Sequence, residues 1–408
     1  MNQPLAEPGK VRLAALPPLA LYIHMPWCVR KCPYCDFNSH ERSGPLPESE
    51  YVERLLADLE ALLPSVWGRR LTSIFIGGGT PSLFSPASID TLLAGVRARI
   101  AVEPGAEITL EANPGTVEAG RFRAFREAGV NRLSIGVQSF DERMLQQLGR
   151  IHSAEEARRA IAGALAAFDN VNIDLMYGLP GQDMAMARAD IDEGAACGVP
   201  HLSAYQLTIE PNTAFHRQPP QLPAHDEAAD MQVMVEGTLA RAGLEHYETS
   251  AFARRGHRCR HNLNYWQFGD YLGIGAGAHG KISFPDRITR HERVKQPKEY
   301  LKMQSTIAAE RVVPASELPF EFMMNALRLV EGFPSALFEE RTGLPLASIA
   351  RALELAESKT LVQRDWRHVR ATEHGQRFLN ELLVLFLPSE KRDPAPDAPA
   401  AGRVIRIS

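Results

Sequence analysis

The chain has 408 residues and a formal net charge of −4 at pH 7, from 45 Lys and Arg against 49 Asp and Glu. This balance argues against nucleic acid as a partner, because polyanions are bound by clustered basic residues. Five cysteines are too few for a disulfide framework in a chain of this length, so we expect a reducing, cytoplasmic compartment.

The N-terminal stretch predicts no membrane span. Residues 1–18 are rich in Pro, Ala and Leu without periodicity, which predicts a flexible lead-in. The apolar run that ends at Ile23 is interrupted by Pro17 and Pro18 and is too short to cross a bilayer. We therefore expect no integral membrane segment, while a peripheral membrane contact stays open.

A strand–helix pattern then repeats six times, over a predicted barrel domain at residues 19–250. The predicted strands are residues 19–25, 71–76, 108–110, 133–137, 171–176 and 202–209. The predicted helices include 48–63, 117–128 and 226–242, one that starts near Ser85, one capped by Ser153 with Glu156, and one that ends near Cys197. Near-continuous apolar strands are typical of parallel strands that helices cover on the outside.

The position of the glycine-rich turn favours a barrel over an open sheet. A Rossmann-type sheet has its glycine-rich turn after the first strand, whereas here cysteines stand there and Gly77, Gly78 and Gly79 follow the second strand. We expect a partial barrel, whose active site forms from the loops that follow the strands.

The repeat stops after residue 243. A strand is predicted over 247–253, and residues 251–315 form a predicted connecting region with a glycine-dense loop at 273–280. Helices at 320–330, 334–341, 346–358 and 374–386, with a hairpin across 361–370, predict a mostly helical, winged-helix-like domain at 316–387. Residues 388–408 have the composition of a disordered tail.

Three interpretations compete for Cys28, Cys32 and Cys35, which follow the first strand. A structural zinc site needs a fourth ligand, which His24, Asp36 or His40 would supply, and usually has a second C-x-x-C pair. A glutaredoxin-like dithiol leaves Cys28 unexplained. An iron–sulfur cluster normally takes four cysteines, so three thiolates would leave one iron open to another ligand. We favour the cluster.

The C-x-x-x-C-x-x-C motif resembles the signature of radical S-adenosylmethionine (SAM) enzymes. The segment Gly77-Gly78-Gly79-Thr80-Pro81 resembles the second motif of that superfamily. The resemblance implies a partial (β/α)6 barrel in which Cys28, Cys32 and Cys35 hold a 4Fe–4S cluster and SAM binds the fourth iron.

Further segments resemble the coproporphyrinogen-dehydrogenase group, namely residues 22–28, 136–140 and 172–180. The oxidases of this group carry another cysteine two positions after the third, where this chain has Phe37. Residues 261–266, His-Asn-Leu-Asn-Tyr-Trp, resemble the heme-binding signature of the heme chaperones in the group. The resemblance implies a chaperone that binds heme and transfers it to an acceptor protein. The alternative is an oxygen-independent coproporphyrinogen III oxidase, a radical SAM oxidative decarboxylase.

The resemblance also implies a set of SAM-binding residues. They are Tyr22, Gly78, Gly79, Thr80, Glu111, Gln138, Arg150 and Asp174. Carboxylates and amides suit the amino-acid and ribose groups of SAM, and an Arg suits a carboxylate. Other roles stay open, because Glu111 could cap the next helix and Gln138 could bind loop backbone. Asp174, inside an apolar strand, must find a polar partner, since unpaired burial is costly.

His261 is a candidate axial ligand of heme iron, because neutral imidazole is a common iron ligand. The alternative is a loop histidine that forms local hydrogen bonds. Tyr265 and Trp266 would form an apolar wall for the porphyrin or simply pack in the core, and Cys259 is either a further iron ligand or a buried thiol. No catalytic residue is assigned.

Overall fold

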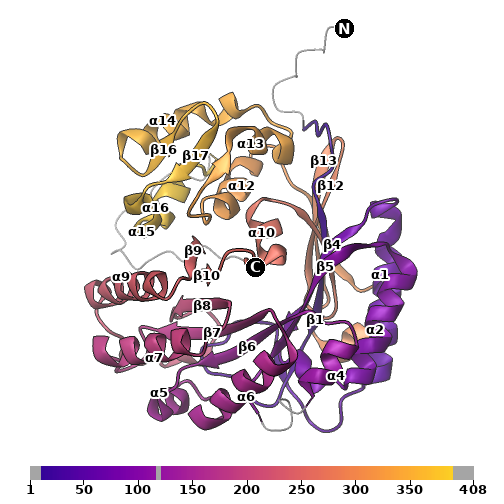
Figure 1. The fold of residues 1–408 in the computed structure, drawn as a ribbon. Helices are drawn as coiled ribbons and strands as arrows, with labels where there is room; N and C mark the ends of the chain where they lie inside the picture. The colour runs from indigo at the N-terminus through magenta and orange to yellow at the C-terminus, as the bar shows by residue number, and fades with distance from the viewer. Residues whose placement is uncertain (1–10, 116–120, 389–408) are drawn as a thin grey trace.

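The computed structural model describes residues 11–115 and 121–388. Within these residues, one sheet of twelve strands has the order β14-β13-β12-β11-β1-β4-β5-β6-β7-β8-β10-β9 (Figure 1). Its parallel part runs from β11 to β8. These strands are β1 Leu19–Met25, β4 Leu71–Gly78, β5 Val102–Ala112, β6 Arg132–Gln138, β7 Val171–Tyr177, β8 His201–Gln206 and β11 Asp270–Ile274.

Helices cover the outer side of this curved sheet, as predicted (Figure 1). They are α1 Glu48–Leu62, α2 Pro86–Arg99, α4 Phe122–Glu127, α5 Glu142–Gln147, α6 Ala154–Ala167, α7 Met184–Ala196 and α9 His225–Arg241. A further short helix, α8 Ala214–Arg217, follows β8. The predicted caps are confirmed: Ser85 accepts a hydrogen bond from the Ser88 amide, and Ser153 forms a capping box with Glu156. The apolar outer faces of the strands and the inner faces of the helices form the main core.

Several predicted bounds were wrong. The third strand starts at Val102 rather than 108, and the sixth ends at Gln206 rather than 209. The predicted start of a helix at residue 117 lies outside the described residues. The single strand predicted at 247–253 is two antiparallel strands, β9 Glu245–Glu248 and β10 Ala251–Ala253, because the chain reverses at residues 249–250.

The glycine-dense segment 273–280, predicted as a loop, is half strand. It contains the end of β11 and the start of β12 (His279–Phe284). β12 pairs with β13 (Arg287–Arg293), which in turn pairs with β14 (Ile307–Val312). A Cβ on Gly273 would overlap the carbonyl of His279, so the glycine lets β11 and β12 lie close together. Residues within the predicted connecting region therefore extend the barrel sheet.

The C-terminal part is mostly helical, with its own apolar core. Its elements are α12 Leu318–Ala326, β15 Phe333–Pro334, α13 Ser335–Thr342, α14 Ala350–Ser358, β16 Val362–Arg364, β17 His368–Ala371, α15 Glu373–Arg377 and α16 Leu379–Val384. The hairpin predicted at 361–370 is present as β16 and β17, which form a small sheet with β15. The helix predicted at 320–330 ends at Ala326, and the last predicted helix is split at Phe378.

Two further elements connect these parts. The helix α10 (Arg260–Trp266) lies between the sheet and α12, and α11 (Pro297–Lys302) packs near α1. Among the described residues, no helix combines the length and apolar character that a membrane span requires.

Candidate functional site

The cysteine loop begins at the carboxyl end of β1. Cys28 ends the short strand β2 (Trp27–Cys28), which pairs with β3 (His40–Glu41) and so closes the loop at its base. Cys32 and Cys35 lie on the loop between them, where the Cys35 amide donates to the Cys32 carbonyl at 3.2 Å. The three predicted cluster ligands are therefore on one irregular loop.

Each thiol has a polar neighbour. The Thr80 hydroxyl donates to Cys28 Sγ at 3.6 Å, and Arg150 Nη1 donates to Cys32 Sγ at 3.6 Å. Cys35 Sγ lies 3.7 Å from the Ser39 hydroxyl. These groups are suited to thiolate sulfurs, which accept hydrogen bonds and attract a guanidinium.

The three thiols have the chemistry of metal ligands, but they are not arranged closely enough to hold a metal ion in this structure. Burial raises the pKa of Cys28, and the nearby thiols of Cys35 and Cys32 raise it further. Within residues 11–115 and 121–388, no group of three His, Cys, Asp or Glu side chains is arranged closely enough to hold a metal ion. An irregular loop with three soft sulfur donors is nevertheless the donor set that an iron–sulfur cluster takes, and binding would order the loop around it.

His24 and His40, two of the candidate fourth ligands for zinc, have hydrogen-bond partners near the loop. His24 Nδ1 is hydrogen-bonded to the Tyr22 hydroxyl at 2.9 Å, and His24 Nε2 to the Asn38 carbonyl at 2.9 Å. His40 Nε2 is 3.2 Å from Asn38 Oδ1. Both imidazoles therefore hold the base of the loop.

The glycine motif packs directly on the cysteine loop. The Gly79 amide donates to the Met25 carbonyl, and the Thr80 amide to the Trp27 carbonyl, each at 2.7 Å. A Cβ on Gly79 would lie 2.6 Å from the Trp27 oxygen, and Gly78 has a φ of +114°. Only glycine fits here, because the end of β4 must approach the backbone that carries Cys28.

Two carboxyl groups lie inside the barrel below this motif. Glu111 accepts from the Gly78 amide at 3.0 Å, and burial, with a contribution from Asp174, raises the pKa of Glu111 to about 7. Asp174 accepts from Asn172 Nδ2 at 2.9 Å and from the Ser134 hydroxyl at 3.3 Å, and burial raises its pKa as well. The prediction that Asp174 needs a polar partner is confirmed.

The other predicted SAM residues lie at the same end of the sheet. Arg150 Nη2 donates to the Gly136 carbonyl at 2.6 Å, and thus links β6 to the cysteine loop. Gln138 has a φ of +71°, which is uncommon for a residue other than glycine and concentrates at functional sites. The eight residues lie on β1, β4, β5, β6 and β7 or in the segments that follow β4 and α5. Their role toward SAM stays a prediction.

His261 lies elsewhere. It is on α10 rather than in a loop, and its side chain is 1% exposed. Its Nδ1 lies 3.0 Å from the Ser73 hydroxyl and its Nε2 lies 3.1 Å from the Tyr265 hydroxyl. Burial lowers the pKa of His261 to about 3. Both ring nitrogens are therefore engaged inside the barrel, away from the cysteine loop.

The neighbours of His261 continue this buried network. Cys259 Sγ lies 3.4 Å from Glu107 Oε1, and burial raises the pKa of the thiol to about 12. Arg328 lies over the Trp266 ring, 4.3 Å from its centroid. The whole 259–266 segment is built into the junction between the sheet and the C-terminal part.

The sequence matches known families over both parts of the chain. It matches the radical SAM superfamily over residues 22–193 and the HemN C-terminal domain over residues 313–378. The protein named heme chaperone HemW from Haemophilus influenzae is 50% identical over 381 residues, which cover 92% of this chain and 99% of that protein. HemW of Escherichia coli is also 50% identical, over 92% of this chain and 100% of that protein.

The chain belongs to the HemW family.

The same fold occurs in a solved structure of lower identity. Coproporphyrinogen III oxidase (HemN) from Escherichia coli superposes with a TM-score of 0.78 at 22% identity, over 92% of this chain and 91% of that one. The predicted fold class, a partial barrel with a C-terminal domain, is thereby confirmed for this HemW-family chain.

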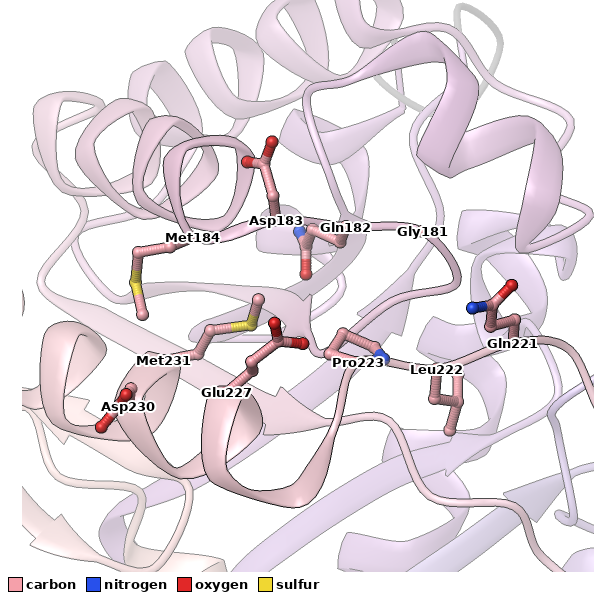
Figure 2. Close-up of a pocket in the computed structure, with 10 residues that line it drawn as sticks. All are labelled: Gly181, Gln182, Asp183, Met184, Gln221, Leu222, Pro223, Glu227, Asp230 and Met231. Carbon is pink, nitrogen blue, oxygen red and sulfur yellow. The ribbon is translucent and has the colours of Figure 1, made fainter.

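The structure of this HemW-family member has cavities that the sequence does not predict. One, of about 610 Å³, lies between residues 181–184 and 221–231 (Figure 2). It is acidic, with Asp183, Glu227 and Asp230 in its wall, and Gln182 Nε2 has no hydrogen-bond partner among the described residues. No local sequence signal marks it, because its two walls come from segments about forty residues apart, one of which includes the start of α9. A second cavity, of about 300 Å³, lies between the β12–β13 hairpin and α12.

Proposed function

We propose that this HemW-family protein is a cytoplasmic heme chaperone that binds heme and transfers it to an acceptor protein. The proposal rests on an alignment over the full length of the relatives. Two proteins named heme chaperones are 50% identical to this chain over nearly their whole lengths. The proposed function involves no nucleic-acid partner. Phe37, whose side chain is 60% exposed, also supports the proposal, because the resemblance leads us to expect a cysteine there in an oxidase.

We further propose a 4Fe–4S cluster on Cys28, Cys32 and Cys35, with SAM as an additional ligand. Such a cluster would supply an iron with an open coordination position. Around it, Thr80 and Arg150 would donate hydrogen bonds to the cysteine sulfurs, as they already do to the thiols. Glu111 and Asp174 would accept hydrogen bonds from SAM, because both are buried carboxyl groups inside the barrel; burial raises the pKa of each.

Hemin titration of the purified full chain tests the proposal. We expect saturable, one-to-one binding, followed as a growing Soret band, and loss of the band when an apo-hemoprotein is added as acceptor. A variant with Cys28, Cys32 and Cys35 replaced by Ser should lose its iron and sulfide after anaerobic reconstitution. Zinc bound in place of iron would contradict the cluster.

The alternative function is tested in parallel. Reconstituted protein is incubated anaerobically with SAM, a reductant and coproporphyrinogen III, and the products are analysed by mass spectrometry. We expect no decarboxylated product. Conversion of the substrate would establish an oxidase, and absence of saturable hemin binding would contradict the chaperone.

A further inference from the structure

A chain of hydrogen bonds crosses the barrel interior from Asp174 to the start of α10. Asn172 and Asp174 lie two residues apart on β7, so their side chains point to the same face of the strand. Asn172 Nδ2 donates to Asp174 Oδ1 at 2.9 Å, and Asn172 Oδ1 lies 2.6 Å from Nδ1 of His201 on β8. His201 Nε2 lies 2.8 Å from the hydroxyl of Tyr247 on β9, whose oxygen accepts from the Cys259 amide at 3.2 Å. We call these five residues the relay.

Every hydrogen bond of the relay points toward Asp174. A carboxylate accepts, so Asn172 turns its NH2 group to Asp174 and its oxygen to His201. His201 Nδ1 therefore carries the ring proton. Burial lowers the pKa of His201 well below its ordinary value, which keeps the ring neutral and leaves Nε2 to accept from the Tyr247 hydroxyl. Hydrogen bonds in such a chain polarise and strengthen one another, most of all away from water.

The side chains of the relay are enclosed, except at the end where a ligand could bind. Asn172, His201, Tyr247 and Cys259 are at most 2% exposed, and Asp174 is more exposed than these four. A buried polar group that loses its partner costs free energy, so the enclosed residues favour one arrangement. The Asp174 carboxylate has room for further donors, such as the hydroxyls of a ribose.

Two acceptors hold the start of α10, and one of them belongs to the relay. Glu107 accepts from the Arg260 amide at 3.1 Å and from the His261 amide at 3.0 Å, which fixes α10 to β5. Tyr247 accepts from the amide of Cys259, the residue directly before α10. The orientation of Asp174 and the position of α10 therefore depend on the same chain of bonds.

We propose that His201 and Tyr247 are positioning residues that couple the proposed SAM site at Asp174 to the start of α10. A ligand on Asp174 would hold the carboxylate in one orientation, so less conformational entropy is lost when the rest of the relay is ordered. The coupling is reciprocal, since a relay that orients Asp174 also favours SAM. SAM would thus hold α10, with the segment 261–266, more firmly. This coupling rests on the proposed binding of SAM and adds two residues to the predicted set.

Hydrogen–deuterium exchange of the anaerobically reconstituted full chain, with and without SAM, tests the coupling. Mass spectrometry of the peptides that contain residues 259–261 reports the opening of α10. We expect SAM to slow this exchange about fivefold in wild type, the usual effect of one hydrogen bond. In Tyr247→Phe, which removes the hydroxyl and keeps the ring, exchange should be faster without SAM and should not respond to it. SAM should also bind this variant more weakly.

Tyr177→Phe is the matched control. Tyr177 is a buried tyrosine on the same strand as Asn172 and Asp174, but an odd number of residues separates it from them, so it lies on the opposite face. This variant should keep the wild-type response to SAM. His201→Phe interrupts the relay at the next link and should reproduce Tyr247→Phe, so the test does not depend on the folding of one variant. Far-UV circular dichroism checks the fold of each.

The outcomes separate the coupling from the SAM site. Equal slowing by SAM in wild type and in Tyr247→Phe would overturn the coupling while the SAM site stands. SAM binding to wild type without slower exchange at residues 259–261 would overturn it too. Failure of wild type to bind SAM, measured beforehand by equilibrium dialysis, would overturn the SAM site and the coupling with it. The experiment contains no hemin, so its result does not depend on heme binding.

Discussion

Gly79 allows the end of β4 to lie close to the cysteine loop because it has no side chain. A Cβ there would lie 2.6 Å from the Trp27 oxygen and 2.9 Å from the Met25 oxygen, both of them backbone atoms. Backbone cannot rotate away as a flexible side chain can, so the strand end and the loop would have to separate. The loop that carries Cys28 would move with Trp27.

We expect Gly79→Ala to fold but to retain less iron than wild type after reconstitution, by at least severalfold. Iron and sulfide content per chain, with the absorbance of the cluster, measures this. Gly115→Ala is the matched control, because nothing lies within 4 Å of a Cβ at that position. Equal iron in Gly79→Ala and the control would show that the close approach has no role in cluster binding.

The structural role of some single residues could be predicted from the sequence, and that of others could not. Ser153 and Glu156 were predictable as a capping box because both groups lie within one helical turn. The burial of His261 was not, because its partners Ser73 and Glu107 are more than 150 residues away in sequence.

Among the elements, α1 is joined to the far part of the sheet by one buried ion pair. Asp58 of α1 lies 2.9 Å from Arg293 Nε of β13, and both side chains are fully buried. The Asp58 carboxylate also accepts from the Tyr300 hydroxyl and the Thr306 hydroxyl, each at 2.8 Å. One carboxylate thus connects a helix from the start of the chain with β13 and the segment after it.

Asp58→Ala should lower the free energy of unfolding by about 3–5 kcal/mol, because the guanidinium of Arg293 would remain buried without a carboxylate. Urea denaturation measures the change. Glu60→Ala provides the control on the same helix, since Glu60 is 54% exposed and its pair with Arg99 should contribute about 0–1 kcal/mol. Similar effects of the two substitutions would argue against a special role for the buried pair.

The strands that extend the barrel were the elements hardest to predict. The six strand–helix units follow from regular apolar runs, and the structure has all six strands. β11 and β12, by contrast, are short and interrupted by glycines, which predicted a loop. Their pairing depends on β1, some 250 residues earlier, and on the close contact at Gly273, neither of which is visible in a local pattern.

At the scale of the whole molecule, the barrel interior contains buried titratable groups, among them Glu111 and Asp174. The pKa of Glu111 is raised to about 7, chiefly by burial. A carboxyl group whose folded pKa lies above its ordinary value of 4.5 stabilises the fold at low pH, and this contribution is lost as the pH rises toward the folded pKa.

We therefore expect wild type to lose about 2–3 kcal/mol more unfolding free energy than Glu111→Gln between pH 5 and pH 8. Urea denaturation of both proteins without cofactor, at several pH values, measures the difference. The difference between the two proteins removes the pH dependence that comes from the carboxyl groups that they share. Parallel pH profiles would contradict a raised pKa at Glu111.

The place of β1 in the sheet has a consequence for how long a bound cofactor would stay. β1 is paired on both sides, with β4 and with β11, while the margins of the sheet are β14 and β9. Local opening begins at weakly held margins and reaches the interior only when the whole domain opens. The loop with Cys28, Cys32 and Cys35 follows the strand that opens late. Fraying at either margin would leave these cysteines in place, so the lifetime of a cluster would depend on global rather than local opening.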